Sequence, residues 1–127
     1  MFRFEKLDVW QRAIDYAGMV YSYTRVFPSD ERFGLTNQMR RAAVSVSSNI
    51  AEGSGRVSDS DFARFLEFAY ASLMEVVSHA TISHRQQILS KESFDNLYRE
   101  SEELARMLSG LRISLVGSSR SSRDSGS

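Results

Sequence analysis

The spacing of the apolar residues is the feature that most narrows what this chain can fold into. Along most of its 127 residues, apolar side chains recur three and four positions apart, which is the period of an amphipathic α-helix. Runs of β-branched residues with period-two alternation are absent, and proline occurs once, at Pro28. The pattern therefore predicts an all-α protein.

The first two helices are expected on either side of Pro28. The first ends before it, because the residue preceding a proline is disfavoured in the helical conformation. Thr36 is the expected N-cap of the second helix, and Gly53 and Gly55 are expected to end it. The apolar series are Leu7, Trp10, Ile14, Ala17, Tyr21 and Thr24, and then Leu35, Met39, Ala42, Val46, Asn49 and Ile50.

N-capping residues predict where the third and fourth helices begin. Ser58 with Asp61 three residues later resembles a capping box, and Ser90 is the expected cap of the last helix. Their series are Phe62, Phe65, Leu66, Ala69, Leu73, Val76 and Ala80, and then Phe94, Leu97, Ser101, Leu104, Leu108, Leu111 and Leu115.

Four amphipathic helices joined by short connections predict an antiparallel up-and-down four-helix bundle over residues 1–116. A chain of this length is the usual size of one domain. Residues 117–127 are rich in serine and contain nothing that would be buried, so we expect a disordered tail.

Composition excludes several classes of protein. The chain has no cysteine, so disulfides and thiolate metal sites are excluded. It has no apolar run of about 18 residues and no N-terminal signal pattern, and we expect a cytoplasmic protein without membrane contact. Sixteen basic side chains balance sixteen acidic ones, whereas a protein that holds a phosphate backbone by bulk charge shows a basic excess.

Residues for catalysis or metal binding are sparse. A di-metal bundle needs Glu-x-x-His on two helices, and neither His79 nor His84 lies three residues after a glutamate. Glu75 and His79 lie four apart and are expected to share one face. The segment Gly53-Ser54-Gly55-Arg56 lacks the length and the lysine of a phosphate-binding loop. We expect no enzyme activity, no cofactor and no metal.

Polar residues on the second helix form a different pattern. Asn49 falls within the apolar series, and a buried polar group costs free energy unless it is hydrogen-bonded. We therefore predict a buried network that joins Asn49 to Arg41 or Arg40, to Glu52 and to Glu75. The alternative interpretation makes Arg40 and Arg41, with Arg56, contacts to a phosphate backbone or to a protein partner.

The third helix carries more apolar surface than one bundle needs. A second stripe contains Phe68, Ala71, Met74 and Val77, and a single stripe is enough to pack a helix within its own bundle. We expect Phe68, Ala71 and Met74, with Trp10 or Tyr21, to form the interface with another copy of the chain.

Several longer segments resemble a known family. They are Phe4-Glu5-Lys6-Leu7-Asp8-Val9-Trp10-Gln11-Arg12-Ala13, Leu35-Thr36-Asn37-Gln38-Met39-Arg40-Arg41-Ala42-Ala43, Ser48-Asn49-Ile50-Ala51-Glu52-Gly53, Phe65-Leu66-Glu67-Phe68-Ala69 and Ser72-Leu73-Met74-Glu75. Over residues 4–115 the chain resembles the bacterial four-helix-bundle proteins encoded in intervening sequences of large-subunit ribosomal RNA genes, often called ribosomal S23-like.

This resemblance implies an up-and-down bundle that associates into a ring of five copies. A related branch, the accessory protein of diversity-generating retroelements, is strongly basic and binds nucleic acid and a reverse transcriptase, whereas this chain has no net charge. We therefore expect a non-enzymatic homo-oligomer, a pentamer by the resemblance, that serves as an RNA-associated or scaffold protein. The alternative is a protein-interaction module with no contact to nucleic acid.

Overall fold

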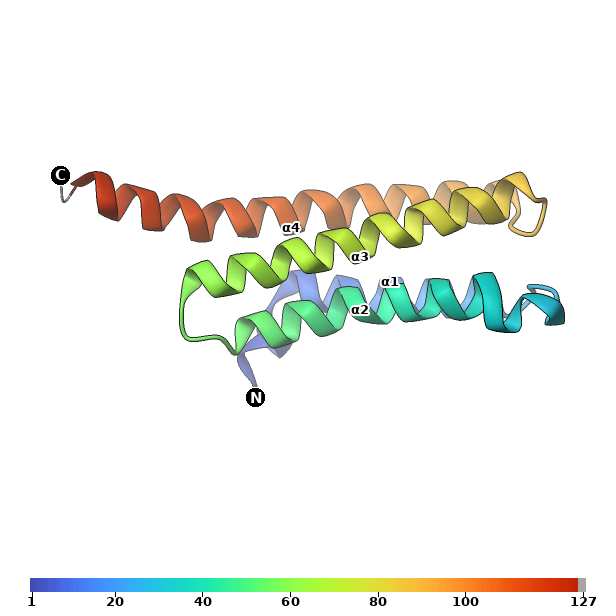
Figure 1. Cartoon of the computed structure of the whole chain (residues 1–127), viewed down its shortest axis with the longest axis horizontal. Helices are drawn as coiled ribbons and strands as arrows, with labels where there is room; N and C mark the ends of the chain where they lie inside the picture. The colour runs from blue at the N-terminus through green and yellow to red at the C-terminus, as the bar shows by residue number, and fades with distance from the viewer. Residues whose placement is uncertain (126–127) are drawn as a thin grey trace.

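The structure, a computed structural model, describes residues 1–125 of the chain and the side chains of residues 1–117. Four long helices run up and down beside one another, and the described residues form no strand (Figure 1). Consecutive helices pack together and α4 returns to pack against α1, which leaves α1 diagonal to α3. The predicted antiparallel four-helix bundle is confirmed. The helices are α1 (Asp8–Thr24), α2 (Asn37–Ser54), α3 (Asp59–Arg85) and α4 (Lys91–Ser125).

Short helical turns occupy the N-terminus and the connection between α1 and α2. A 3-10 turn, Arg3–Lys6, precedes α1, and a 3-10 turn and a π-helical turn, Ser29–Glu31 and Arg32–Thr36, lead into α2. The carboxylate of Glu31 accepts a hydrogen bond from the backbone N–H of Leu35 at 3.2 Å. Thr36 has helical backbone angles and no capping bond, so its prediction as an N-cap is wrong, because the helical turn begins upstream of it.

The two serine caps are confirmed. The Ser58 hydroxyl accepts from the backbone N–H of Asp61 at 3.1 Å, and Ser90 accepts from Ser93 at the same distance. The Asp61 carboxylate turns to Arg64 at 3.2 Å instead of completing a capping box. These caps satisfy amides that have no partner within their helices.

Gly53 has a different role from the one expected. It lies buried inside α2, and the cap residue Gly55 has φ −86°, so neither glycine adopts a left-handed conformation to end the helix. A Cβ at position 53 would lie 2.6 Å from the Cβ of Phe65 and 3.0 Å from the ring of Phe62. Gly53 is therefore required for the close approach of α2 to α3.

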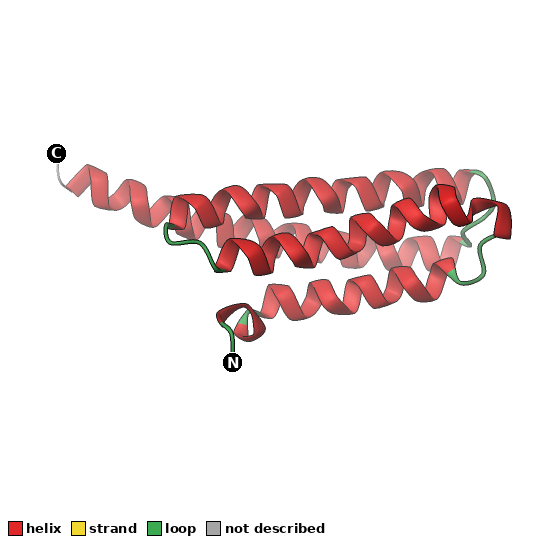
Figure 2. Ribbon diagram, turned by 60° about the horizontal axis from the view of Figure 1, so that its bottom comes forward, coloured by secondary structure: helices red, strands yellow, loops and turns green. Residues whose placement is uncertain are grey.

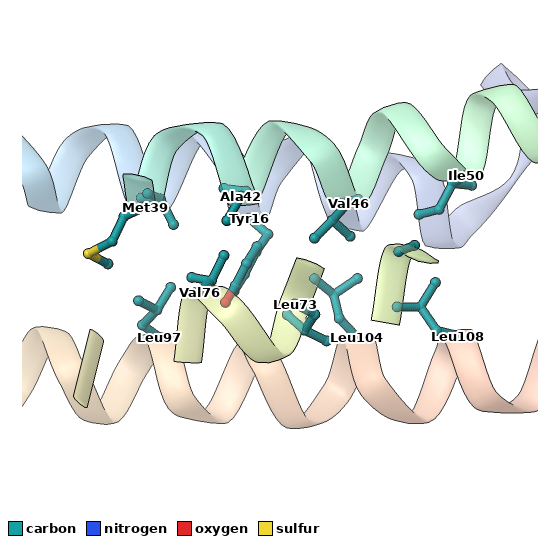
Figure 3. Packing of buried hydrophobic residues seen from close by; sticks show 14 of the residues in the cluster. Tyr16, Met39, Ala42, Val46, Ile50, Leu73, Val76, Leu97, Leu104 and Leu108 are labelled. Atoms are coloured by element: carbon teal, nitrogen blue, oxygen red, sulfur yellow. The ribbon is translucent and has the colours of Figure 1, made fainter. Parts of the chain in front are cut away.

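The core follows the predicted series on three of the four helices. Figure 3 shows the side chains of α2, α3 and α4 meeting along the bundle axis. The fourth series is the clearest match, since Leu97, Ser101, Leu104 and Leu108 are all buried. Short loops join the helices without interrupting this core (Figure 2).

On α1 only Thr24 of the predicted apolar series is buried, and the other members lie on the flank of the helix. The buried apolar residues of α1 are Val9, Ala13, Tyr16 and Val20. Ile14 is 41% exposed, because α1 has two apolar stripes and the bundle covers the second only in part.

Tyr16 crosses the core from α1 (Figure 3). Its hydroxyl lies 2.7 Å from the hydroxyl of Ser101 on α4, and Ser101 in turn donates to the backbone carbonyl of Leu97 at 2.7 Å. Tyr16 is therefore the donor in the first bond. Burial raises the pKa of the Tyr16 phenol well above its usual range, so the hydroxyl stays neutral.

The C-terminal end of α4 extends past the other helices (Figure 1). The sequence predicts disorder from residue 117, whereas α4 continues to Ser125. Residues 126–127 of the predicted tail lie outside the described residues. The division into a bundle and a disordered tail stays a prediction.

Candidate interaction surfaces

Arg40 binds within its own bundle. Its Nε donates to the hydroxyl of Thr24 at 2.9 Å, and its guanidinium carbon lies 4.6 Å from the centre of the Tyr21 ring. Both partners belong to α1, so Arg40 holds α2 against α1. Its charge is only partly available to an external ligand.

Arg41 is placed differently. It is exposed, and among the described residues it makes no hydrogen bond or ion pair. It lies at the edge of two surface depressions, one toward α1 and one toward α3. The depression toward α3, called the α2–α3 groove below, is lined by Phe33, Asn37, Gln38, Arg41, Ala42, Ser45 and Glu75.

Arg56 lies at the opposite end of α2 and is already paired. Its Nη2 lies 3.3 Å from the Glu52 carboxylate, and its guanidinium covers the Phe65 ring at 4.5 Å. Arg64 contacts the same ring at 5.4 Å. The structure therefore places Arg56 apart from Arg40 and Arg41.

The predicted buried network does not form within the chain. Asn49 is half-buried and donates to the backbone carbonyl and the hydroxyl of Ser45, at 2.9 and 3.1 Å, and Ser45 lies 2.8 Å from Ser72 of α3. The exposed Arg41 and Glu52 take no part in it, and Glu75 lies 3.5 Å from His79 on its own helix. The prediction is wrong because a serine one turn away satisfies Asn49 locally.

Of the expected interface residues on α1, Tyr21 is 39% exposed and Trp10 is half-buried against the Phe4 ring. Val44 of α2 lines the same depression as Tyr21, and Ile14 lies two helical turns before Tyr21 on α1. Each is 41% exposed, and the sequence interpretation assigned neither to an interface. We call Ile14, Tyr21 and Val44 the α1–α2 surface. Val44 belongs to no predicted series, and only its exposure in the folded chain identifies it.

The expected interface residues on α3 form a second surface. Phe68 and Met74 are 44% and 40% exposed, and Ala71 between them is also exposed. We call Phe68, Ala71 and Met74 the α3 surface. Since α1 and α3 are diagonal, the predicted single interface is divided between two faces of the bundle.

The two remaining contact lines between neighbouring helices, the α1–α4 and α3–α4 seams, are bridged by ion pairs. Arg12 of α1 meets Glu100 of α4 at 2.7 Å, and this hydrogen bond raises the pKa of Arg12. Arg112 of α4 meets Glu67 of α3 at 3.1 Å. Because these charges bind one another, the α1–α4 and α3–α4 seams are weaker candidates for a partner.

Clusters of metal-ligating residues and membrane spans are absent from the part of the chain that the structure describes. No group of three or more His, Asp or Glu side chains is placed to hold a metal ion there. None of the helices is long and apolar enough to cross a membrane over these residues.

These features define a class: an all-α up-and-down four-helix bundle with large apolar side chains exposed on two of its faces. The chain belongs to the family of 23S rRNA-intervening sequence proteins, whose family model matches residues 5–110. The fold is similar to a crystal structure from Bacteroides thetaiotaomicron, described as a protein of unknown function from the S23 ribosomal protein family. The TM-score is 0.72 and the identity 21%, covering 85% of this chain and 97% of the other. No curated protein matches the chain.

Proposed function

We propose that this protein is a non-enzymatic scaffold that assembles from several copies of itself. The observation that supports it is the exposure of large apolar side chains on the α1–α2 surface and the α3 surface. Clustered apolar residues on the outside of a bundle are typical of protein–protein contacts.

The placement of the two surfaces favours head-to-tail association. Ile14 and Tyr21 lie on α1, which is diagonal to α3, so this part of the α1–α2 surface does not pack beside the α3 surface. A contact between one surface of one copy and the other surface of the next is heterologous, and such contacts form a ring when the rotation closes. The family resemblance supplies the expected number of five copies.

Charge supports the same arrangement. Residues 1–57, which contain α1 and α2, carry eight basic and six acidic side chains, a net charge of +2. Residues 58–116, which contain α3 and most of α4, carry six basic and nine acidic side chains, a net charge of −3. A head-to-tail contact brings the basic half of one copy to the acidic half of the next, which favours that contact over like-to-like pairing.

A mixing experiment tests the proposal. Val44→Glu changes the α1–α2 surface and Met74→Lys changes the α3 surface, at positions exposed enough to leave the core intact. We expect wild type to form an oligomer by light scattering and each variant alone to be a monomer. A mixture of the two variants retains one intact surface of each kind and should form a dimer with one copy of each.

The matched control is Ile113→Glu, since Ile113 is 62% exposed on α4 and outside both surfaces. It should assemble like wild type. A monomeric wild type at micromolar concentration contradicts the proposal, and variants that stay monomeric when mixed contradict the head-to-tail arrangement.

The scaffold's partner is the second part of the proposal. Structured RNA is the leading candidate, because Arg41 is exposed and without a charged partner in the described chain, and another protein is the alternative. Titration of labelled structured RNA at low and moderate salt separates them. Phosphate contacts make the affinity fall steeply with salt, whereas absence of binding at low salt leaves the protein partner.

A further inference from the structure

The α2–α3 groove combines unpaired polar groups with an exposed aromatic ring. Asn37, Gln38 and Arg41 line it from α2, and their side chains have no hydrogen-bond partner among the described residues. Glu75 lines it from α3, and its Oε1 lies 3.5 Å from Nε2 of His79. The groove therefore offers both donors and acceptors to a ligand.

Phe33 lies at one end of this groove, on the π-helical turn before α2. Its side chain is 84% exposed, and the Arg32 guanidinium lies 5.5 Å from its ring centre. A phenylalanine so exposed gains little from folding. An open ring beside an arginine is the arrangement on which nucleobases stack in single-stranded nucleic-acid sites.

The two charged residues of the groove, Arg41 and Glu75, are suited to different parts of a nucleotide. A guanidinium binds phosphate oxygens. A carboxylate repels phosphate and accepts hydrogen bonds from the amino groups of bases. The phosphate is therefore expected at Arg41 and the base edge at Glu75, with the amides of Asn37 and Gln38 able to serve as donors and acceptors.

The opposite end of the bundle shows why the groove is distinctive. Arg56 and Arg64 also lie over an aromatic ring, but each is paired with a carboxylate, Glu52 and Asp61. The ring they share, that of Phe65, is 7% exposed and leaves no surface for a base. A ligand there has to break ion pairs and finds no stacking platform.

We propose that the α2–α3 groove holds one nucleotide of a single-stranded nucleic acid, with the base stacked on Phe33 and the phosphate bound by Arg41. The inference rests on the RNA association proposed above and names where an unpaired nucleotide is held. It does not depend on self-association, because every residue of the groove comes from one chain.

The experiment is a titration of a short, unstructured, labelled RNA by fluorescence anisotropy. Phe33→Ala should weaken binding by about 5- to 150-fold, the effect of losing one base–aromatic stack. Phe33→Leu should be as weak, because it is apolar but not aromatic, whereas Phe33→Trp should bind at least as well as wild type. Val26→Ala is the matched control, since Val26 is 82% exposed and lies outside the groove.

The arginine variants test the phosphate contact. Arg41→Ala should reduce the slope of log affinity against log salt by about 0.7, the value for one phosphate of a single strand. Arg56→Ala should leave this slope unchanged. If adenosine monophosphate displaces the labelled RNA, a free nucleotide binds in the same groove. If only unlabelled RNA displaces it, the groove binds the nucleotide as part of a polymer.

Three results would overturn the inference: no binding of the unstructured RNA at low salt, equal losses for Phe33→Ala and Val26→Ala, or equal slopes for Arg41→Ala and Arg56→Ala. If structured RNA still binds in a salt-dependent manner, the proposed RNA association stands and only the groove is rejected. If no RNA binds, both are rejected.

Discussion

Replacing Gly53 with alanine adds one methyl group at the closest approach of α2 to α3. The new Cβ would lie 2.6 Å from the Cβ of Phe65, a distance that real Cβ atoms essentially never show. The Phe65 Cβ is attached directly to the backbone, so a change of rotamer does not move it away. Relief requires a shift of the backbone of α2 or α3 near this contact.

The expected cost comes from two opposing effects. Alanine is favoured over glycine in a helix interior by about 1 kcal/mol. Overpacking a core by one methyl group costs about 1–3 kcal/mol. The free energy of unfolding should therefore fall by up to about 2 kcal/mol on balance.

Gly110 provides the matched control, because it also lies inside a helix and a Cβ there meets nothing within 4 Å. Gly110→Ala should raise the free energy of unfolding by up to about 1 kcal/mol, so the two variants should differ by about 1–3 kcal/mol. Urea denaturation at one fixed protein concentration measures this difference, since self-association changes apparent stability. Equal stabilisation by both substitutions would refute the close-contact argument.

Three further predictions concern single contacts. Tyr16→Phe should lower the free energy of unfolding, measured by urea denaturation, by about 0.5–1.5 kcal/mol. Ser101→Ala should lower it more, because that substitution leaves the buried phenol of Tyr16 without an acceptor, and the reverse order would contradict Tyr16 as the donor. Ser58→Ala should cost about 1 kcal/mol by removing the N-cap of α3, and an unchanged urea midpoint would count against the cap. The hydrogen bond from Lys91 lowers the pKa of Asp95, so its stabilisation is present at neutral pH and is lost as the pH falls through the folded-state pKa. The difference in urea midpoint between wild type and Asp95→Asn should therefore shrink below about pH 4, and a constant difference from pH 6 to pH 3 would contradict this.

The fourth helix shows how much of the fold follows from the pattern of residues. Leu97, Ser101, Leu104 and Leu108 are spaced three and four apart, and all four are buried as predicted. The neighbouring stripes of this helix are polar, so only one face is apolar enough to enter the core. Periodicity is decisive under that condition.

The first helix shows where the same reasoning fails. Its core stripe includes Tyr16, and its other stripe includes Trp10 and Ile14, so both faces are candidates for burial. In the structure, the hydroxyl of the buried Tyr16 donates a hydrogen bond to the hydroxyl of Ser101, which lies 85 positions away along the chain. Local spacing contains no information about that partner.

The candidate groove also could be predicted only in part from the sequence. Arg41 and Arg56 are both arginines near the ends of α2, and residue type predicts the same role for each. The pair of Arg56 with Glu52 is a local contact four residues apart, but only the folded chain shows that Arg56 also covers the Phe65 ring of α3, whereas Arg41 faces the groove that ends at Phe33. Contacts with α3 therefore help to decide which charge is available to a ligand.

The amino-acid sequence by itself determined the helices, most of their core faces and the up-and-down order, because these depend on period, caps and short connections between neighbours. The tertiary structure alone decided which α1 stripe is buried, why Gly53 is required, and that Arg41 faces a groove without a charged partner among the described residues. Those outcomes depend on side chains brought together from distant parts of the chain, where a contact of a few ångströms changes the free energy of each residue.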